Sequence, residues 1–369
     1  MPRLYGRNFT HDEITAHTGD LSQLAGIRMM TLSDGQEDSV RIADVRTGSG
    51  LRFQVTLDRG MDISVADYRG IPLAWRSPVG DVHPAFFDAE GLGWLRSFAG
   101  GLMTGCGLTY LGEPCVDEGE PLGLHGRLSH LPARKVSSRT EWIGEECKFF
   151  VEGTMEEYHP FREHLTLQRT IETTLGESVI EVCDTVRNEG TNATPLMILY
   201  HINAGWPVVD NGARLLLRSQ RTLPRDDIAT PGLDTARLVE EPQPGYLGQL
   251  FYHDLVPDPN GFVVAMIRND ALDLGLFVRY RQAELKRFAE WKMMGAGTYV
   301  LGMEPANCGV GGRAAERAQG TLQFLEPGED RHFALQIGVV EGHAALEEYI
   351  SNNHLDLTHH ILPLIGDGE

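Results

Sequence analysis

The chain has 369 residues, of which 41% are hydrophobic and 23% are charged, a balance typical of a folded globular protein. Its 52 acidic and 32 basic residues give a formal net charge of −20, which repels phosphate backbones and anionic lipid surfaces. Composition and charge therefore argue against a nucleic-acid partner or a membrane partner.

Strand patterns dominate the chain from residue 39 onward. Runs rich in β-branched and aliphatic residues predict strands at 39–45, 51–57, 61–66, 165–174, 179–186, 196–201, 213–218, 262–268, 272–280, 298–303, 321–325 and 332–340. Short helices are expected only at 20–25 and 344–350. Many short strands without interleaved helices predict an all-β fold of stacked, mostly antiparallel sheets. With no internal repeat and no Pro/Ser-rich linker, we expect residues 1–369 to form a single domain.

The segment 77–129 differs from the rest because it is rich in glycine and shows little alternation. Such a composition predicts long loops that cover a sheet. Long loops without secondary structure of their own are usually functional. We therefore expect a binding site beside this segment.

Cysteine usage and the first residues bear on the cellular compartment. The five cysteines are odd in number, and no pair has the C-x-x-C spacing of zinc or redox motifs. Cys147 and Cys183 occur in strand-like stretches, where we expect them to be small buried hydrophobic residues. The first fifteen residues lack the apolar segment of a secretory signal. These features predict a cytoplasmic protein with no membrane segment.

Three short motifs carry side chains suited to acid/base chemistry. His125 lies in Gly123-Leu-His-Gly-Arg127, His201 ends an apolar strand in Leu199-Tyr-His-Ile-Asn203, and Glu304 follows a strand in Gly302-Met-Glu-Pro-Ala-Asn307. Each motif alone is more typical of a loop or turn residue than of a catalyst. Their occurrence together predicts a cleft that contains all three side chains.

In order and approximate spacing, these motifs resemble those of the aldose 1-epimerases, or galactose mutarotases. The resemblance is closer to a branch of aldose 1-epimerase-like proteins largely of unknown function, through Asp58-Arg-Gly-Met-Asp-Ile63, Gly100-Gly-Leu-Met-Thr-Gly-Cys-Gly107 and Leu124-His-Gly-Arg127. It covers about residues 20–340, which would form the core of the domain. It implies a galactose mutarotase-like β-supersandwich that binds a sugar on its concave sheet.

The resemblance also implies residue roles in an aldose 1-epimerase. Glu304 would remove the proton of the C1 hydroxyl, His201 would protonate the ring oxygen, and His125 would hydrogen-bond sugar hydroxyls. A carboxylate titrates well below neutrality and an imidazole close to it, which suits a base and an acid. The partner is then a small-molecule sugar, and neither a cofactor nor a metal is required.

The sequence departs from the family pattern in its substrate-binding residues. The stretch 97–104 lacks the family's arginine, and Arg96 or Arg127 would have to replace it. The family's substrate-binding aspartate has no clear match, although Asp254 and Asp258 lie in the right region. Asp58 and Arg59 are either site residues or a buried pair that fixes a tight turn, and we favour the structural role. The predicted sugar-contacting residues are Arg96, Arg127, Asn203, Asp258 and Trp291.

Three alternatives remain open at this stage. The same residues could epimerise or isomerise a ketose or a uronate. A metal-assisted version would add His83 or His253 to the two histidines and the glutamate. A non-catalytic sugar-binding protein could also use this fold. Of Trp75, Trp94, Trp206 and Trp291, we expect at most one or two near the sugar. A homodimer is the default assembly.

Overall fold

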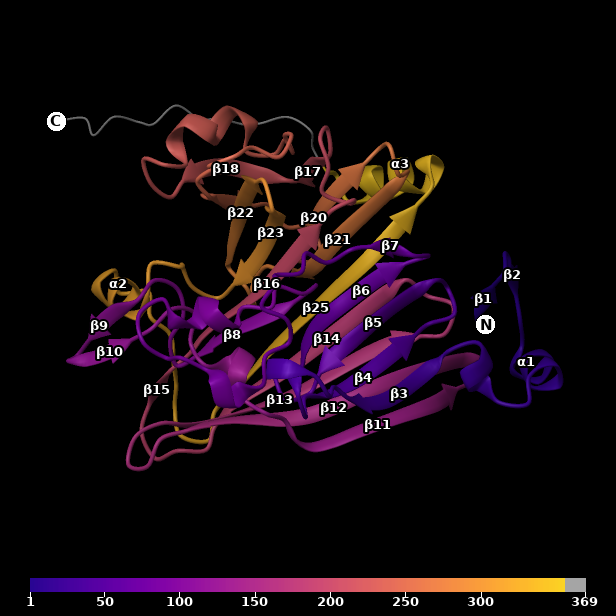
Figure 1. Cartoon of the computed structure of the whole chain (residues 1–369), viewed down its shortest axis with the longest axis horizontal. Coiled ribbons are helices and arrows are strands. Elements are labelled where there is room, and N and C mark those ends of the chain that lie inside the picture. Colours follow the sequence, from indigo (N-terminus) through magenta and orange to yellow (C-terminus); the bar gives the residue numbers. More distant parts are fainter. Residues whose placement is uncertain (356–369) are drawn as a thin grey trace.

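The protein is built almost entirely from antiparallel sheets, as expected, and the computed structural model describes residues 1–355 (Figure 1). The largest sheet has eight strands. In spatial order these are β11 (Arg134–Ile143), β12 (Glu146–Tyr158), β13 (His164–Thr174), β14 (Val179–Asn188), β25 (Asp330–Glu341), β21 (Leu274–Arg281), β20 (Phe262–Asn269) and β17 (Arg214–Leu217).

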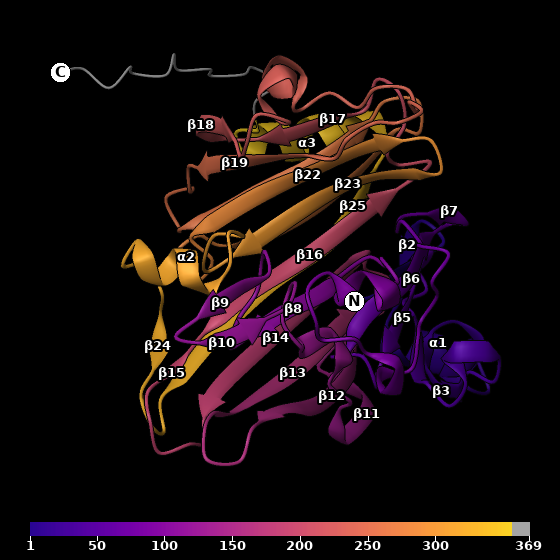
Figure 2. The same cartoon turned by 60° about the vertical axis from the view of Figure 1, so that its left-hand side comes forward.

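Two further sheets pack with this one. The six-stranded sheet runs β18 (Ser219–Pro224), β19 (Gln249–Leu255), β22 (Arg287–Gly295), β23 (Thr298–Ala306), β16 (Met197–Gly205) and β8 (Thr104–Leu108). The five-stranded sheet runs β3 (Gly26–Thr31), β4 (Arg41–Arg46), β5 (Leu51–Thr56), β6 (Asp62–Tyr68) and β7 (Ile71–Pro72). Figure 2 views the six-stranded sheet with strands of the eight-stranded sheet behind it.

The remaining elements are short. Three strand pairs are β1 (Arg3–Leu4) with β2 (Arg7–Asn8), β9 (Cys115–Asp117) with β10 (Glu120–Leu122), and β15 (Thr194–Pro195) with β24 (Phe324–Leu325). The α-helices are α1 (His11–His17), α2 (Arg313–Ala318) and α3 (His343–Asn352). The 3₁₀ helices are η1 (Leu21–Gln23), η2 (Gly35–Glu37), η3 (Pro84–Phe86), η4 (Gly93–Ser97), η5 (Leu128–His130) and η6 (Thr230–Thr235). No helix within residues 1–355 is long and apolar enough to cross a membrane.

One apolar core joins the three large sheets. It includes Val55 from the five-stranded sheet, Leu167 and Val278 from the eight-stranded sheet, and Ile198 from the six-stranded sheet. All nine residues of β16 are buried, because this strand is covered by the core on one face and by loops on the other. Burial on both faces also fits the sequence, since residues 190–209 contain no Asp, Glu, Lys or Arg.

Several sequence expectations need correction. The helix expected at 20–25 is only the 3₁₀ helix η1, and the strand expected at 321–325 contains only β24. Cys183 is exposed on β14, because it lies on the face opposite to the core, whereas Cys147 is buried as expected. The segment 77–129 consists mainly of loops with η3, η4 and the short strands β8, β9 and β10.

Candidate active site

The alternation of strand residues places the three predicted acid/base side chains around one cavity. On β16, Tyr200 and Ile202 belong to the core, so His201 faces the opposite way. On β23, Met303 likewise packs in the core and Glu304 lies on the other face. His125 approaches from the glycine-rich segment with a left-handed backbone (φ 56°). The resulting cavity has a volume of about 400 Å³.

Glu304 and His201 form a close pair on the floor of this cavity. His201 Nε2 lies 3.2 Å from Glu304 Oε1, and both side chains are almost fully buried. The two atoms are not aligned for a hydrogen bond, and Glu304 Oε1 has no hydrogen-bond partner among the described residues. His201 Nδ1 and His125 Nδ1 also lack partners in residues 1–355. Buried polar atoms are rarely left unpaired, so these atoms are suited to contact a bound polar molecule.

Burial shifts the titration of all three groups. It raises the pKa of Glu304 to about 8, opposed by the positive charge of Arg225. It lowers the pKa of His201 to about 3, with a further decrease from His125 and an opposing contribution from the amide of Asn203. The pKa of His125 falls to about 4 for the same reason. At neutral pH the Glu304–His201 pair therefore carries one proton and no net charge.

A glycine provides the space in which this pair meets. A Cβ atom on Gly302 would lie 2.9 Å from Glu304 Oε1, 3.0 Å from Trp291 Cβ and 3.3 Å from His201 Cε1. The first two distances are too short for an undisturbed arrangement. Glycine at 302 thus keeps the cavity floor open between the acid and the base.

Aromatic rings form much of the cavity wall. Trp75, Trp94, Phe98 and Trp291 all line it. Trp291 packs edge-on against His201 with ring centroids 5.5 Å apart. Three tryptophans therefore line the cavity, whereas Trp206 is exposed outside the lining set. Flat apolar rings suit the C–H faces of a sugar.

The sequence reasoning missed an arginine in this cavity. Arg225, which follows β18, lines the cavity and donates from Nε to Asp226 Oδ2 (2.8 Å) and from Nη1 to Glu113 Oε1 (3.1 Å). Glu113 lines the same cavity. No local motif marks Arg225, because it reaches the cavity only through the pairing of β18 with β19.

The other predicted sugar contacts lie elsewhere, except Trp291. Arg96 is exposed and has Asp88 as its nearest ion-pair partner at 3.8 Å, and Arg127 is also exposed. Asp258 accepts hydrogen bonds from Asn260 and Phe262 in a turn. None of these three belongs to the lining set defined by the described residues. Their assignment as sugar contacts stays a sequence prediction without geometric support.

Asn203 supports the backbone of the floor instead. Its amide nitrogen donates to the carbonyls of Gly101 (3.0 Å) and His201 (2.9 Å). It does not line the cavity. Asn203 therefore fixes the strand that carries His201 and influences the titration of this histidine.

The extra histidines of the metal alternative are engaged away from the cavity. His253 contacts Glu290 (2.8 Å) and Thr222 (3.0 Å), and His83 accepts a hydrogen bond from the backbone of Ala85. Within residues 1–355, no group of three His, Cys, Asp or Glu side chains is arranged to hold a metal ion. Neither His83 nor His253 completes a metal site with the cavity residues.

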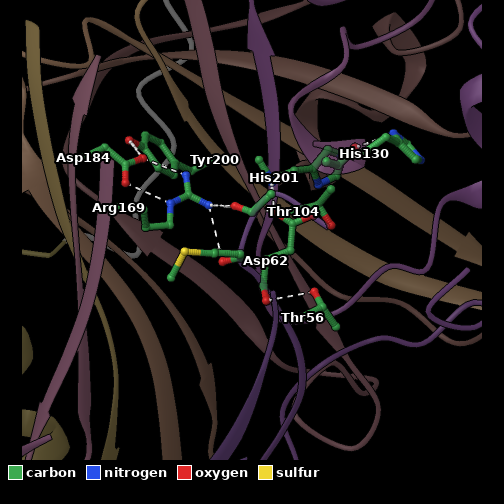
Figure 3. Close-up of polar contacts among 12 residues, drawn as sticks. Thr56, Asp62, Thr104, His130, Arg169, Asp184, Tyr200 and His201 are labelled. Carbon is green, nitrogen blue, oxygen red and sulfur yellow. Dashed lines mark hydrogen bonds and ion pairs between the residues drawn. The ribbon is translucent and has the colours of Figure 1, made fainter. Parts of the chain in front are cut away.

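A buried ionic network lies on the core side of β16 (Figure 3). Arg169 donates from Nε and Nη2 to the two carboxylate oxygens of Asp184 (2.8 and 2.6 Å), and the Tyr200 hydroxyl donates to Asp184 as well (2.7 Å). Asp62 lies 3.8 Å from Arg169, and burial raises its pKa to about 7. Since Tyr200 precedes His201, this network anchors the strand beneath the acid/base pair.

The Asp58-Arg-Gly-Met-Asp-Ile63 motif is structural, as expected for Asp58 and Arg59. Asp58 accepts hydrogen bonds from the backbone and guanidinium of Arg41. Asp62 accepts one from the backbone of Gly105 (2.8 Å), next to Thr104 on β8. Asp58 and Arg59 do not pair with each other, because Arg59 donates to the carbonyls of Val82 and Ser97 rather than to Asp58.

The fold resembles that of proteins of the galactose mutarotase-like class. A candidate aldose 1-epimerase from Klebsiella pneumoniae is 25% identical, with a TM-score of 0.85 over 89% of this chain and 86% of that chain. A galactose mutarotase-like protein from Clostridium acetobutylicum is 13% identical, with a TM-score of 0.61 over 86% and 99% of the two chains. A galactose 1-epimerase from Lactobacillus acidophilus is 11% identical, with a TM-score of 0.54 over 86% and 100%. The last two show the fold alone.

The chain belongs to the family described as a domain of unknown function, DUF4432, whose model matches residues 37–339. A search of curated proteins finds no match. The expected galactose mutarotase-like fold is thus confirmed, and the family itself assigns no reaction.

Proposed function

We propose that this protein is a sugar isomerase that interconverts the anomers of a free aldose. One observation carries the proposal: a carboxyl group and an imidazole lie 3.2 Å apart on the floor of an aromatic-walled cavity, with a second imidazole beside them. Anomer exchange requires a base at one sugar oxygen and an acid at its neighbour. A pair of this kind can supply both.

The reaction needs one proton, which the pair already holds. Transfer of this proton from Glu304 to His201, once the bound sugar has brought the two groups into line, gives a carboxylate and an imidazolium without changing the total charge. The pKa values of about 8 and about 3 make this transfer the costly step. The carboxylate then takes the proton of the C1 hydroxyl while the bond between C1 and the ring oxygen breaks, and His201 gives its proton to that oxygen. After rotation about C1–C2 the steps reverse on the other face of the aldehyde, and both protons return.

His125 completes the proposed site from the opposite wall. Its ring lies 6.0 Å from that of His201, and burial keeps it neutral at physiological pH. A neutral imidazole donates one hydrogen bond and accepts another, which suits a sugar hydroxyl. We assign His125 to binding the hydroxyls next to the reacting carbon.

The contacts of Arg225 with two carboxylates favour a neutral sugar over a uronate as the substrate. A free guanidinium would attract a carboxylate, but Arg225 already contacts Asp226 and Glu113. The two carboxylates offset its charge, and its remaining N–H groups are suited to hydroxyl oxygens. A uronate is therefore the weaker alternative.

NMR with a panel of aldoses, ketoses and uronates tests the proposal. We expect faster exchange between the α and β signals of an aldose, with no new compound. Glu304→Gln and His201→Ala should each lower the rate on the order of 10²- to 10⁴-fold. Formation of a new sugar would instead identify an epimerase or isomerase. Full activity in either variant would contradict the mechanism.

Compartment and assembly are part of the proposal. All five cysteines are free, and three of them are buried, which supports a reducing compartment such as the cytoplasm. Dimerisation and the single-domain organisation stay predictions, which light scattering and limited proteolysis would test.

A further inference from the structure

A set of buried polar residues behind the aromatic wall has no part in the proposed chemistry. Arg59, from the motif at residues 58–63, is almost fully buried. Its guanidinium donates to the carbonyl of Val82 (2.6 Å) and to that of Ser97 (2.8 Å). Arg59 thus ties together both ends of the loop that carries Trp94.

Trp94 is held by a closed ring of hydrogen bonds. Its indole nitrogen donates to Ser129 Oγ (3.1 Å), which contacts His130 Nδ1 (3.1 Å). His130 Nε2 contacts Ser97 Oγ (2.7 Å), and Ser97 Oγ donates to the backbone carbonyl of Trp94 (3.3 Å). The ring therefore begins and ends on the same tryptophan.

Donor and acceptor chemistry gives this ring a single direction. The indole can only donate and the carbonyl can only accept, so each hydroxyl accepts from one neighbour and donates to the next. This order requires His130 to carry its proton on Nε2 and to accept at Nδ1. Burial and the charge of Arg59 also lower the pKa of His130 well below its usual value, which keeps the ring neutral.

Trp94 in turn contacts a proposed site residue. Its ring packs edge-on against His125 with centroids 4.8 Å apart, and it stacks on Phe98 at 4.5 Å. The Nδ1 atom of His125 has no hydrogen-bond partner within residues 1–355. No hydrogen bond at that atom fixes the His125 ring, so contact with Trp94 is well placed to set its orientation.

We infer that His130 and Ser129 are positioning residues that hold the indole of Trp94, and through it the imidazole of His125, in the orientation the cavity requires. Figure 3 shows His130 on the other side of His201 from Arg169, separate from the ionic network behind β16. The expected effect on activity rests on the proposed function. The expected effect on the orientation of the His125 ring does not rest on it.

Ser129→Ala tests the inference because it opens the hydrogen-bond ring by removing one oxygen atom. We expect kcat/KM for anomer exchange to fall roughly tenfold, since small misplacements of binding groups are costly. In a His125→Ala background the same change should cost less than twofold, because the residue through which it acts is gone. Ser129→Thr, which keeps the hydroxyl, should restore activity.

Thr222→Ala is the matched control. It also removes a buried hydroxyl that contacts a histidine, in this case His253, but it lies outside the cavity lining. We expect a comparable loss of stability and unchanged kcat/KM. Ser97→Ala opens the hydrogen-bond ring at its other end. It provides an independent double-mutant cycle with His125→Ala if Ser129→Ala fails to fold.

NMR of the His125 imidazole separates this inference from the proposed function. The edge-on contact places this ring in the ring-current field of Trp94, so Ser129→Ala should move its C–H signals and Thr222→Ala should not. Unmoved signals, or equal losses of kcat/KM with and without His125, would overturn the positioning role. Moved signals in a protein without any anomer exchange would support positioning and refute the proposed reaction.

Discussion

The buried carboxyl of Glu304 should make the stability of this protein depend on pH in a specific way. Burial raises its pKa from 4.5 to about 8. Between these values unfolding releases a proton, so the folded state loses stability as pH rises from about 4.5 to 8. A shift of this size corresponds to roughly 5 kcal/mol, because each pKa unit is worth about 1.4 kcal/mol. Glu304→Gln removes the ionisation while keeping nearly the same shape.

Urea denaturation at pH 5, 7 and 9 measures this contribution directly. Relative to wild type, we expect the Glu304→Gln variant to gain about 2 to 4 kcal/mol between pH 5 and pH 9, the lower value allowing for water in the cavity. Thr173→Val is the control, because it removes a buried hydroxyl that donates to the carbonyl of Val179 and leaves every ionisable group in place. Its difference from wild type should stay constant over this range. A constant difference for Glu304→Gln as well would refute the assigned titration.

Four further predictions concern the site and its support. Anomer exchange should decline above about pH 8, as the Glu304–His201 pair loses its proton, and a pH profile of kcat that stays flat to pH 10 would contradict this. Gly302→Ala should lower kcat/KM at least tenfold and destabilise the protein by about 1 to 3 kcal/mol, because the added methyl group lies against Glu304 Oε1 and Trp291 Cβ; an unchanged kcat/KM in the folded variant would argue against it. Asp184→Asn should destabilise the protein by about 3 to 5 kcal/mol in urea, since it leaves the buried guanidinium of Arg169 without its charge partner, and a loss below 1 kcal/mol would count against the network. Arg96→Ala should change kcat/KM less than twofold, because its exposed side chain lies outside the cavity lining, whereas a tenfold loss would restore its role in sugar binding.

Much of the fold could be predicted because strand alternation is a local signal. The alternation of residues 179–186 puts Ile180, Val182 and Val186 on one face of β14, and that face is buried. The same rule does not explain Asp184, which is buried on that face. Its burial depends on Arg169 and Tyr200, which come from other strands and leave no local mark in the sequence.

Non-local strand pairing also explains why the sequence does not predict Arg225 as a residue of the site. The motifs around His125, His201 and Glu304 could be recognised because each has a distinctive short context. Arg225 has none, and it reaches the cavity because β18 pairs with β19, which pairs with β22. Proximity in sequence points to Arg96 and Arg127, but it does not determine the direction of a side chain from a loop.

The energetics of the cavity floor favour an enzyme over a sugar-binding protein. Binding alone would require free hydrogen-bonding groups, but it would not require an acid and a base side by side. Here the unpaired Oε1 of Glu304 and Nδ1 of His201 are both buried, and the raised pKa of Glu304 means that its ionisation opposes folding. Buried polar atoms without partners cost about 1 to 3 kcal/mol each. This buried, unpaired acid and base lower stability, but they suit a reaction in which a proton moves between them. Anomer exchange is such a reaction.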